Sequence, residues 1–509
     1  MSPNVHSAVL SRRRLLQGIA AFSTSVLVSG CNKALTVSSL PTSAQLATGP
    51  QQPVPSGPVS QASLSVSSTT VGNIGQGFAG LSYEKSALCE PLFSAANTDL
   101  VGLFKLLGPG VLRIGGNSVD QSVWVQGGAG RTAGQIAPSD VAALAAFVIE
   151  ADWQCIYGIN LGGAATGATT PELAAAEVAY AAQQFGPSLI GIEIGNECDG
   201  YGAPSSYFAG NWSLAQFEAL WEQFRTAIQA KTPGVTITGP ASGSHESTWT
   251  VPFGQAVGSS DLALLTQHYY RGNGQSSNAT AANLLSPDSN LQNNLAILSA
   301  GAKSSGIPFR MAECNSYYGG GATGVSDTYA SSLWVIDFLF NCAQGGAAGV
   351  NLHGGGNTSC YTPIADSEGA VIEARPVFYG MTLFTQAGQG KLCQTGLSAG
   401  QIDATAYAVK TASGGLNIVV VNKDPSQNLQ LTATLPQIAS SAKLLSMTQL
   451  SNGASGPNLA ATSDVTIQGG TINPDGSFSP SAAYGLSADS SQLSFYVPAL
   501  SAVLIQTAA

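Results

Sequence analysis

The chain has 509 residues, of which 44% are hydrophobic and only 9% are charged, with 60 Gly and 25 Pro. This composition excludes a disordered or coiled-coil protein, and the length exceeds what one hydrophobic core usually sustains, so we expect a large domain with a smaller companion. With 18 basic against 28 acidic residues and a net charge of -10, the chain cannot neutralise many phosphates or sulfates, which argues against nucleic acid or a densely sulfated polymer as its principal partner.

The N-terminus resembles an export signal. The basic residues 12–14 precede a short apolar run over residues 19–28, and small residues lead to Cys31. These features are typical of a twin-arginine signal and of a lipoprotein cleavage site, and the run is too short to span a bilayer. We therefore expect residues 1–31 to be removed. The protein would be periplasmic, at the cell surface or secreted, and a lipid on Cys31 would be its one membrane contact.

Two short segments follow this signal. Residues 32–60 are rich in Ser, Thr, Pro and Gln, which predicts a disordered tether. Residues 61–75 alternate between polar and apolar side chains, which predicts a strand that joins a C-terminal β-sandwich.

Residues 76–388 repeat one unit, a short apolar run followed by a longer stretch with helical spacing. The eight runs are Gln76–Glu84, Gly110–Asn117, Trp153–Leu161, Leu189–Glu197, Val235–Pro240, Leu262–Tyr270, Pro308–Glu313 and Ala348–His353. Parallel strands that are buried on both faces have this continuous apolar character. Eight units predict a (β/α)8 TIM barrel.

Residues 389–509 change to short alternating strands separated by turn residues, which predicts an antiparallel β-sandwich. The expected fold class is therefore α/β, a (β/α)8 TIM barrel with a C-terminal antiparallel β-sandwich domain. The seven cysteines after Cys31 form no disulfide framework, so we expect small core residues and leave one bridge open. No Cys/His cluster has the spacing of metal ligands, and we expect neither a metal nor another cofactor.

Two acidic residues end strands of the predicted barrel. The fourth run ends in Gly195-Asn196-Glu197 and the seventh in Glu313. Loops at the carboxyl ends of barrel strands converge, so the two carboxyl groups can face each other across a sugar. Glycoside cleavage needs one protonated and one ionised carboxyl group; a separation of about 5 Å implies retention of configuration, and a wider gap implies inversion. The alternative is that each Glu caps a helix or pairs with Arg.

The chain resembles glycoside hydrolase family 79 of clan A, the family of bacterial β-glucuronidases and of heparanase. The resemblance extends from about Ala62 to the end. Its most specific motifs are Leu112-Arg113-Ile114-Gly115-Gly116-Asn117, Gly195-Asn196-Glu197, His268-Tyr269-Tyr270 and Glu313-Cys314-Asn315-Ser316-Tyr317-Tyr318-Gly319-Gly320.

The resemblance implies a role for each matching residue. Glu197 would be the acid/base and Glu313 the nucleophile. Asn196 would bind the sugar 2-hydroxyl, and Tyr269 would donate to the nucleophile. The pocket for a uronate carboxylate would consist of Tyr318, Gly319, Gly320 and Tyr361.

Further residues end strands at the same side of the barrel. Glu84, Asn117 and His353 could contact the outer hydroxyls of the terminal sugar, although Glu84 and Asn117 differ in type from the heparanase residues. We expect Arg113 to be a buried support for Glu313 or Asn196. Trp124 and Trp249 could line the cleft or pack in the core.

The resulting hypothesis is a retaining exo-β-glucuronidase that acts as a monomer on carbohydrates with a terminal glucuronate. Heparanase-like endo-cleavage is one alternative. Action on β-glucosides or β-xylosides is a second, and a carbohydrate-binding surface lipoprotein without catalysis is a third.

Overall fold

The computed structural model describes residues 49–210, 212–450, 456–488 and 491–508. The chain divides into two units, residues 1–44 and 45–509, and the description below concerns the second. The predicted export signal, Cys31 and most of the predicted tether lie outside the described residues. Within the described ranges, no helix has both the length and the apolar character needed to cross a membrane.

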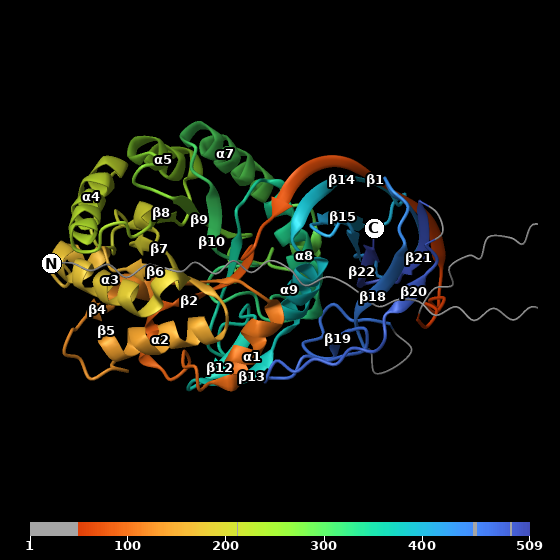
Figure 1. The fold of residues 1–509 in the computed structure, drawn as a ribbon, viewed down its shortest axis with the longest axis horizontal. Coiled ribbons are helices and arrows are strands. Elements are labelled where there is room, and N and C mark those ends of the chain that lie inside the picture. Colours follow the sequence, from red (N-terminus) through yellow and green to blue (C-terminus); the bar gives the residue numbers. More distant parts are fainter. Residues whose placement is uncertain (1–48, 211, 451–455, 489–490, 509) are drawn as a thin grey trace, which may run out of the picture. The chain divides into compact units, whose positions relative to one another are not determined.

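Eight parallel strands close into a barrel, in the order β10-β11-β2-β3-β6-β7-β8-β9 (Figure 1). Each strand falls within one of the eight apolar runs of the sequence or overlaps it, so the predicted TIM barrel is confirmed. Their bounds are β2 Ala79–Glu84, β3 Val111–Gly115, β6 Gln154–Ile159, β7 Leu189–Ile194, β8 Ile237–Ser242, β9 Leu264–Tyr270, β10 Phe309–Asn315 and β11 Val350–Gly354.

Helices follow the barrel strands and cover their outer face (Figure 1). In α4, Ser213 accepts a hydrogen bond from the backbone N–H of Gln216, and an apolar stripe that includes Trp221 and Phe224 is buried against the barrel. The helices are α1 Thr98–Leu107, α2 Pro138–Glu150, α3 Pro171–Phe185, α4 Leu214–Lys231, α5 Val251–Val257, α6 Ala281–Leu285, α7 Ser289–Ser305, α8 Tyr329–Gln344 and α9 Pro376–Ala387.

A second sheet of ten strands has the order β19-β18-β22-β16-β15-β14-β1-β17-β21, with β20 beside β18. All its pairs are antiparallel except that of β1 with β17. One apolar core contains residues from both ends of this order, so the sheet curls over itself as a sandwich does. The strands are β1 Val59–Ile74, β14 Gly390–Ser398, β15 Ala404–Thr411, β16 Leu416–Asn422, β17 Asn428–Thr434, β18 Ser441–Gln449, β19 Val465–Ile467, β20 Tyr484–Leu486, β21 Gln492–Val497 and β22 Ser501–Ala508.

The segment before β1 corrects part of the tether prediction. The side-chain amide of Gln52 donates to the backbone carbonyl of Tyr496, and its side-chain oxygen accepts from the backbone N–H of the same residue. The expected disorder over residues 32–60 is thus wrong from residue 49 onward. A Ser- and Pro-rich composition does not prevent a segment from pairing with an edge strand such as β21, whose outer backbone groups are available.

The barrel and the second sheet share a packed junction. Residues of β16, β18 and β22 belong to the same apolar core as α8 and α9. Tyr329 in α8 donates to the backbone carbonyl of Leu500 at 2.8 Å. Two short strand pairs lie in the barrel loops: β4 Val123–Trp124 pairs in parallel with β5 Gln135–Ile136, and β12 Ile364–Ser367 pairs antiparallel with β13 Ala370–Ala374.

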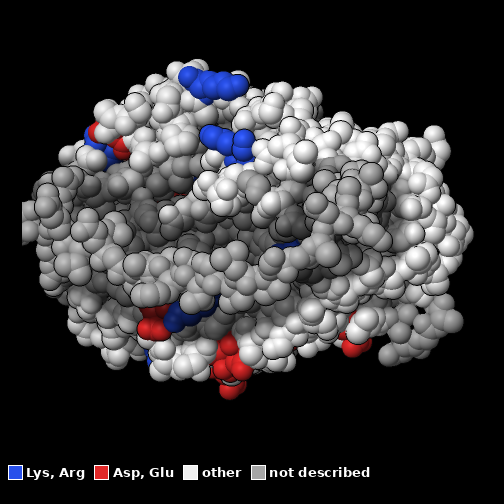
Figure 2. Space-filling model, turned by 45° about the vertical axis from the view of Figure 1, so that its right-hand side comes forward, with Lys and Arg blue, Asp and Glu red and all other residues white. Residues whose placement is uncertain are grey.

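The cysteines of the described ranges are all free. Cys89 and Cys360 are partly exposed and the other five are buried, which agrees with small core residues. Charged side chains are sparse, and Figure 2 shows them isolated from one another or in small groups on the face that it draws.

Candidate active site

A cavity of about 700 Å³ lies at the carboxyl ends of the barrel strands. Its size falls within the range of small-molecule sites, and its position is the one that TIM barrels use for chemistry. Among the described residues, those that line it include no Lys or Arg: Glu84, Asn117, Glu197, Asp199, Gly200, Gly243, Ser244, His245, Tyr270, Glu313, Tyr318, Gly319, Gly320, His353 and Tyr361.

A tight turn after β7 presents Glu197 to this cavity. Gly195 has a φ of 87°, and a Cβ there would lie only 2.4 Å from Sγ of Cys198, so only glycine fits. Glu197 itself is left-handed, with a φ of 48°, and its backbone N–H donates to the carbonyl of Ala241 at 2.7 Å. A non-glycine residue in this region costs about 1–3 kcal/mol, and such strain clusters at functional sites.

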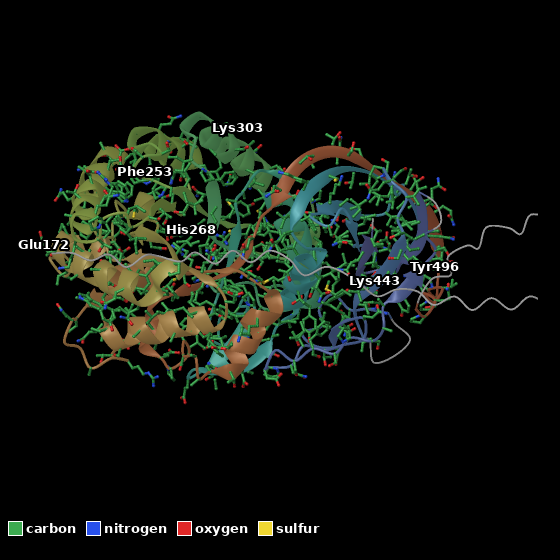
Figure 3. The ribbon with its side chains drawn as sticks, in the orientation of Figure 1. Glu172, Phe253, His268, Lys303, Lys443 and Tyr496 are labelled. Atoms are coloured by element: carbon green, nitrogen blue, oxygen red, sulfur yellow. The ribbon has the colours of Figure 1, made fainter. Side chains whose placement is uncertain are left out.

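His268 at the end of β9 lies between the two acidic residues, inside the barrel unit (Figure 3). Its Nδ1 is 3.1 Å from Oε1 of Glu197 and 4.0 Å from Oε2 of Glu313. One ligand-type atom from each of the three residues lies within 4.8 Å of the others. By distance alone the three could hold an ion, and the same closeness brings two carboxyl groups together across one reacting bond.

The two carboxyl groups have different surroundings. The side chain of Glu313 is 8% exposed, whereas that of Glu197 is 39% exposed. Burial alone would raise the pKa of Glu313, but the charges of His353, His268 and Arg113 outweigh it and hold that pKa well below its usual range. Glu313 is therefore ionised and shielded, and Glu197 can exchange protons with whatever enters the cavity.

Arg113 in β3 holds Glu313 and Asn196 in place. Its guanidinium is fully buried and binds Oε2 of Glu193 at 2.6 Å, Oε2 of Glu313 at 2.7 Å and Oδ1 of Asn196 at 2.8 Å. The predicted support role agrees with these contacts. Gly115 makes room for the guanidinium, because a Cβ there would lie 2.4 Å from its central carbon. The side-chain oxygen of Asn196 is thereby occupied, which leaves its NH2 group as the donor for a ligand.

The predicted contact of Tyr269 with the nucleophile is wrong. Tyr270 donates to Oε1 of Glu313 at 2.9 Å, whereas Tyr269 donates to Oδ2 of Asp288 at 2.6 Å. Successive side chains of β9 point to opposite faces of the barrel wall, so only one of the two adjacent tyrosines can face the interior. Tyr269 points outward and its ring stacks on Phe338 of α8.

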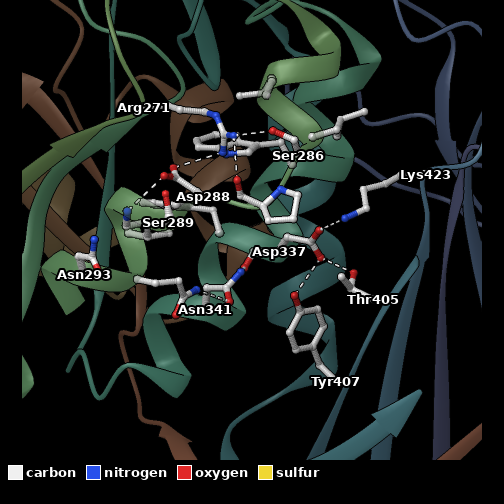
Figure 4. Close-up of a pocket in the computed structure, with 17 residues that line it drawn as sticks. Arg271, Ser286, Asp288, Ser289, Asn293, Asp337, Asn341, Thr405, Tyr407 and Lys423 are labelled. Carbon is white, nitrogen blue, oxygen red and sulfur yellow. Dashed lines mark hydrogen bonds and ion pairs between the residues drawn. The ribbon is translucent and has the colours of Figure 1, made fainter. Parts of the chain in front are cut away.

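Asp288 belongs to a second cavity, of about 490 Å³, shown in Figure 4. Arg271 lies 3.2 Å from Asp288, and Lys423 lies 2.9 Å from Asp337. The charged groups that line this space are thus paired with each other, and the space lies at the junction of barrel and sheet.

Two glycines of a consecutive three, Gly319 and Gly320, line the main cavity. Gly319, Gly320 and Gly321 have φ values of 79°, 86° and 95°, which side-chain-bearing residues rarely adopt. The ring of Tyr361 lies 6.1 Å from that of Tyr270, and the Tyr318 side chain is half exposed above it. The four residues of the predicted uronate pocket, Tyr318, Gly319, Gly320 and Tyr361, thus line one cavity.

Glu84 and His353 also line the cavity, and the ring of His353 lies 6.1 Å from that of Tyr361. The carboxylate of Glu84 accepts from the backbone N–H groups of Asn117 and Ser118, at 3.1 and 2.7 Å, so it also caps the short 3-10 helix Asn117–Gln121. His353 lies 3.7 Å from Glu84 and 3.7 Å from Glu313. Burial lowers the pKa of His353, but the two carboxylates outweigh it, and the net effect is to raise that pKa.

The sequence analysis did not predict the residues that line the cavity next to Glu197. Asp199, Gly200, Gly243, Ser244 and His245 line the cavity there and come from the loops after β7 and β8. Only the position of Asp199, two residues after Glu197, hinted at this. The two tryptophans left open, Trp124 and Trp249, are buried and do not line the cavity.

No protein-family model matches the chain. A stretch of 131 residues is 28% identical to a β-glucuronidase of Aspergillus niger, and it spans 24% of this chain and 24% of that protein. A 4-O-α-L-rhamnosyl-β-D-glucuronidase of Fusarium oxysporum has a similar structure, with a TM-score of 0.71 and 20% identity over 87% of this chain and 99% of that one. The α-L-arabinofuranosidase of Thermotoga maritima matches with a TM-score of 0.63 and 15% identity over 88% of this chain and 100% of that one. These similarities establish a TIM barrel with a β-sandwich as the shared fold.

Proposed function

We propose that the protein is a retaining exo-β-glucuronidase. The observation that carries this proposal is the pair of carboxyl groups at the end of β7 and β10, with oxygens within 4.8 Å of each other. Retaining glycosidases need carboxyl groups about 5 Å apart, whereas inverting ones leave room for a water between them. The partial similarity to a β-glucuronidase supports glucuronate as the sugar that is released.

The contrast between the two carboxyl groups supports their roles. Ionised Glu313 attacks the anomeric carbon while Glu197 gives its proton to the leaving oxygen, so the glycosidic bond breaks as a glycosyl ester forms. Glu197 then takes a proton from water, whose oxygen displaces Glu313 and releases the sugar. An acid/base must meet both the leaving group and water, which suits the 39% exposure of the Glu197 side chain.

The walls of the cavity suggest which sugar enters. A terminal uronate needs hydrogen-bond donors for its carboxylate, and Gly319, Gly320, Tyr318 and Tyr361 can supply them without Lys or Arg. Asn196 would donate to the 2-hydroxyl, while Glu84, Asn117 and His353 would meet the outer hydroxyls. The volume of about 700 Å³ suits a terminal sugar better than a stretch of polymer.

The setting of the enzyme is part of the proposal. A twin-arginine signal would export the folded chain, and lipidation of Cys31 would anchor it to a membrane. The enzyme would act there as a monomer.

The test compares aryl β-glucuronide, β-glucoside and β-xyloside as substrates of the wild type, Glu197→Ala and Glu313→Gln. We expect preference for the glucuronide, at least a hundredfold loss in both variants, and release from oligosaccharides of glucuronic acid together with a chain shortened by that one residue. Preference for a neutral sugar would refute the uronate pocket. Equal rates in wild type and Glu313→Gln would refute the proposed enzymatic activity and favour a carbohydrate-binding protein.

A further inference from the structure

The residues that line the active-site cavity form two groups. One group surrounds Glu313 and consists of the residues assigned above to the terminal sugar. The other adjoins Glu197: a Cβ on Gly243 would lie 2.8 Å from the carboxyl carbon of Glu197. Since the acid must reach the glycosidic oxygen, the leaving group has to lie on this second side.

A buried carboxylate fixes the shape of this second side. Asp199, whose side chain is 4% exposed, accepts from the backbone N–H groups of Gly243 and Ser244 at 2.9 and 3.0 Å. Its Oδ2 also lies 2.9 Å from Nδ1 of His245. The loop after β8 is therefore held in place, although the side chain of His245 is 60% exposed to the cavity mouth.

These contacts determine what His245 offers to a ligand. A carboxylate only accepts hydrogen bonds, so Nδ1 of His245 carries a proton, and in the tautomer whose single proton is on Nδ1 the other nitrogen, Nε2, is an acceptor. Ser244 Oγ also contacts Nδ1, at 2.9 Å. A Ser-His-Asp nucleophile needs Ser and Asp on opposite ring nitrogens, so this cluster is no second hydrolase site.

We propose that the Asp199, Ser244 and His245 cluster is the leaving-group subsite, and that Nε2 of His245 accepts a hydrogen bond from a hydroxyl of a second sugar. This inference rests on the proposed function. Apart from Glu197, the described residues that line this side are Asp199, Gly200, Gly243, Ser244 and His245, and none of these is a Phe, Tyr or Trp on which a flat aglycone could stack. The nearby Trp249 is 9% exposed and lies outside the lining. The favoured substrate class is a glucuronyl-sugar rather than an aryl glucuronide.

The test uses kcat/KM for glucuronic acid β-linked to galactose or to xylose, and for 4-nitrophenyl β-glucuronide, whose leaving group lacks a hydroxyl donor. We expect His245→Ala to lower kcat/KM for the better disaccharide about tenfold, the worth of one hydrogen bond, and to change the aryl substrate less than about twofold. His245→Gln, which retains an acceptor, should recover part of the loss.

Glu246→Gln is the matched control, because Glu246 is the next residue along the chain but binds Asn294 at 2.6 Å and does not line the cavity. It should change neither substrate. The proposed subsite would be overturned if His245→Ala lowered kcat/KM equally for both substrates or lowered it for neither. It would also be overturned if the wild type cleaved no disaccharide. A wild type that cleaves the aryl glucuronide in these cases would leave the proposed function intact; one that cleaves no glucuronide would overturn both.

Discussion

At the scale of single residues, the hydrogen bond from Tyr270 to Glu313, the proposed nucleophile, is the contact with the sharpest consequence. Tyr270→Phe removes a bond of 2.9 Å to ionised Glu313, and such bonds are worth about 1.5–3 kcal/mol. We expect kcat/KM for an aryl glucuronide to fall about tenfold to a hundredfold. Tyr269→Phe is the matched control and should retain the rate, because that hydroxyl binds Asp288. The opposite ranking of the two variants would contradict the assignment.

The pKa of Glu313 predicts a pH dependence with a definite sign. Protonation of the nucleophile stops the reaction, and the charges of His353, His268 and Arg113 hold its pKa below the usual range despite burial. Activity should therefore persist below the pH at which an ordinary Glu, with a pKa of about 4.3, is protonated. His353→Gln removes one of these charges, so the acid limb of kcat/KM should move to higher pH. If the acid limb of this variant stayed at the same pH or moved to lower pH, the charge of His353 would not be a cause of the low pKa of Glu313.

Sequence reasoning identified some of these residues and missed others for physical reasons. Glu197 and Glu313 end strands of an eightfold repeat, so their meeting in one cavity follows from topology. The choice of Tyr269 ignored the two-residue alternation of side chains along a strand, and because β9 is buried on both faces its pattern does not show which tyrosine faces the interior. Asp199 and His245 meet through two loops, whose conformation no periodic pattern specifies.

At the scale of elements, a buried ion pair joins the loop after β2 to α3. Nζ of Lys85 lies 2.6 Å from Glu177 and donates to the carbonyl of Gly158 at 2.7 Å. Lys85→Met would leave the Glu177 carboxylate buried without its cation, at a cost of about 3–5 kcal/mol of folding free energy. We expect a clearly lower denaturation midpoint by intrinsic fluorescence.

The double variant Lys85→Met/Glu177→Leu tests the cause of that loss. It removes both charges and replaces them with apolar volume, so much of the lost stability should return. A double variant as unstable as the sum of the single ones would mean that packing, not the stranded charge, sets the cost.

Element prediction from sequence succeeded where the pattern was local. The eight barrel strands are buried apolar runs and were identified, as was the strand before the barrel. The strand β14, Gly390–Ser398, contains no uninterrupted apolar alternation and is specified by pairing with β1 and β15 rather than by a local pattern. Residues 49–58 were assigned to a tether, because composition does not reveal an available sheet edge.

At the scale of the whole molecule, barrel and sheet are held together partly by Asp337 of α8. It accepts from Nζ of Lys423 at 2.9 Å and from the hydroxyl of Tyr407 at 3.0 Å, as Figure 4 shows. Burial lowers the pKa of Lys423, but Asp337 and Asp403 outweigh it and raise that pKa. A raised lysine pKa means that the stabilisation is complete at neutral pH and is lost only as pH rises through the folded-state value.

Asp337→Asn should therefore lower the stability at neutral pH by about 1.5–3 kcal/mol, the range for hydrogen bonds to charged groups. The loss relative to wild type should shrink at strongly alkaline pH. The rate on an aryl glucuronide should stay within about twofold of wild type, because Asp337 does not line the active-site cavity. Thermal unfolding and kcat/KM measured on the same preparations test both parts, and a large loss of rate in the still-folded variant would contradict them.

The whole account depends on a retaining reaction in which Glu313 and Glu197 both act on the substrate. The anomeric form of the first product tests this most directly. Proton NMR during hydrolysis of an aryl β-glucuronide should show β-glucuronic acid first, followed by slow mutarotation to the α form. Appearance of the α form first would mean inversion and contradict Glu313 as the nucleophile.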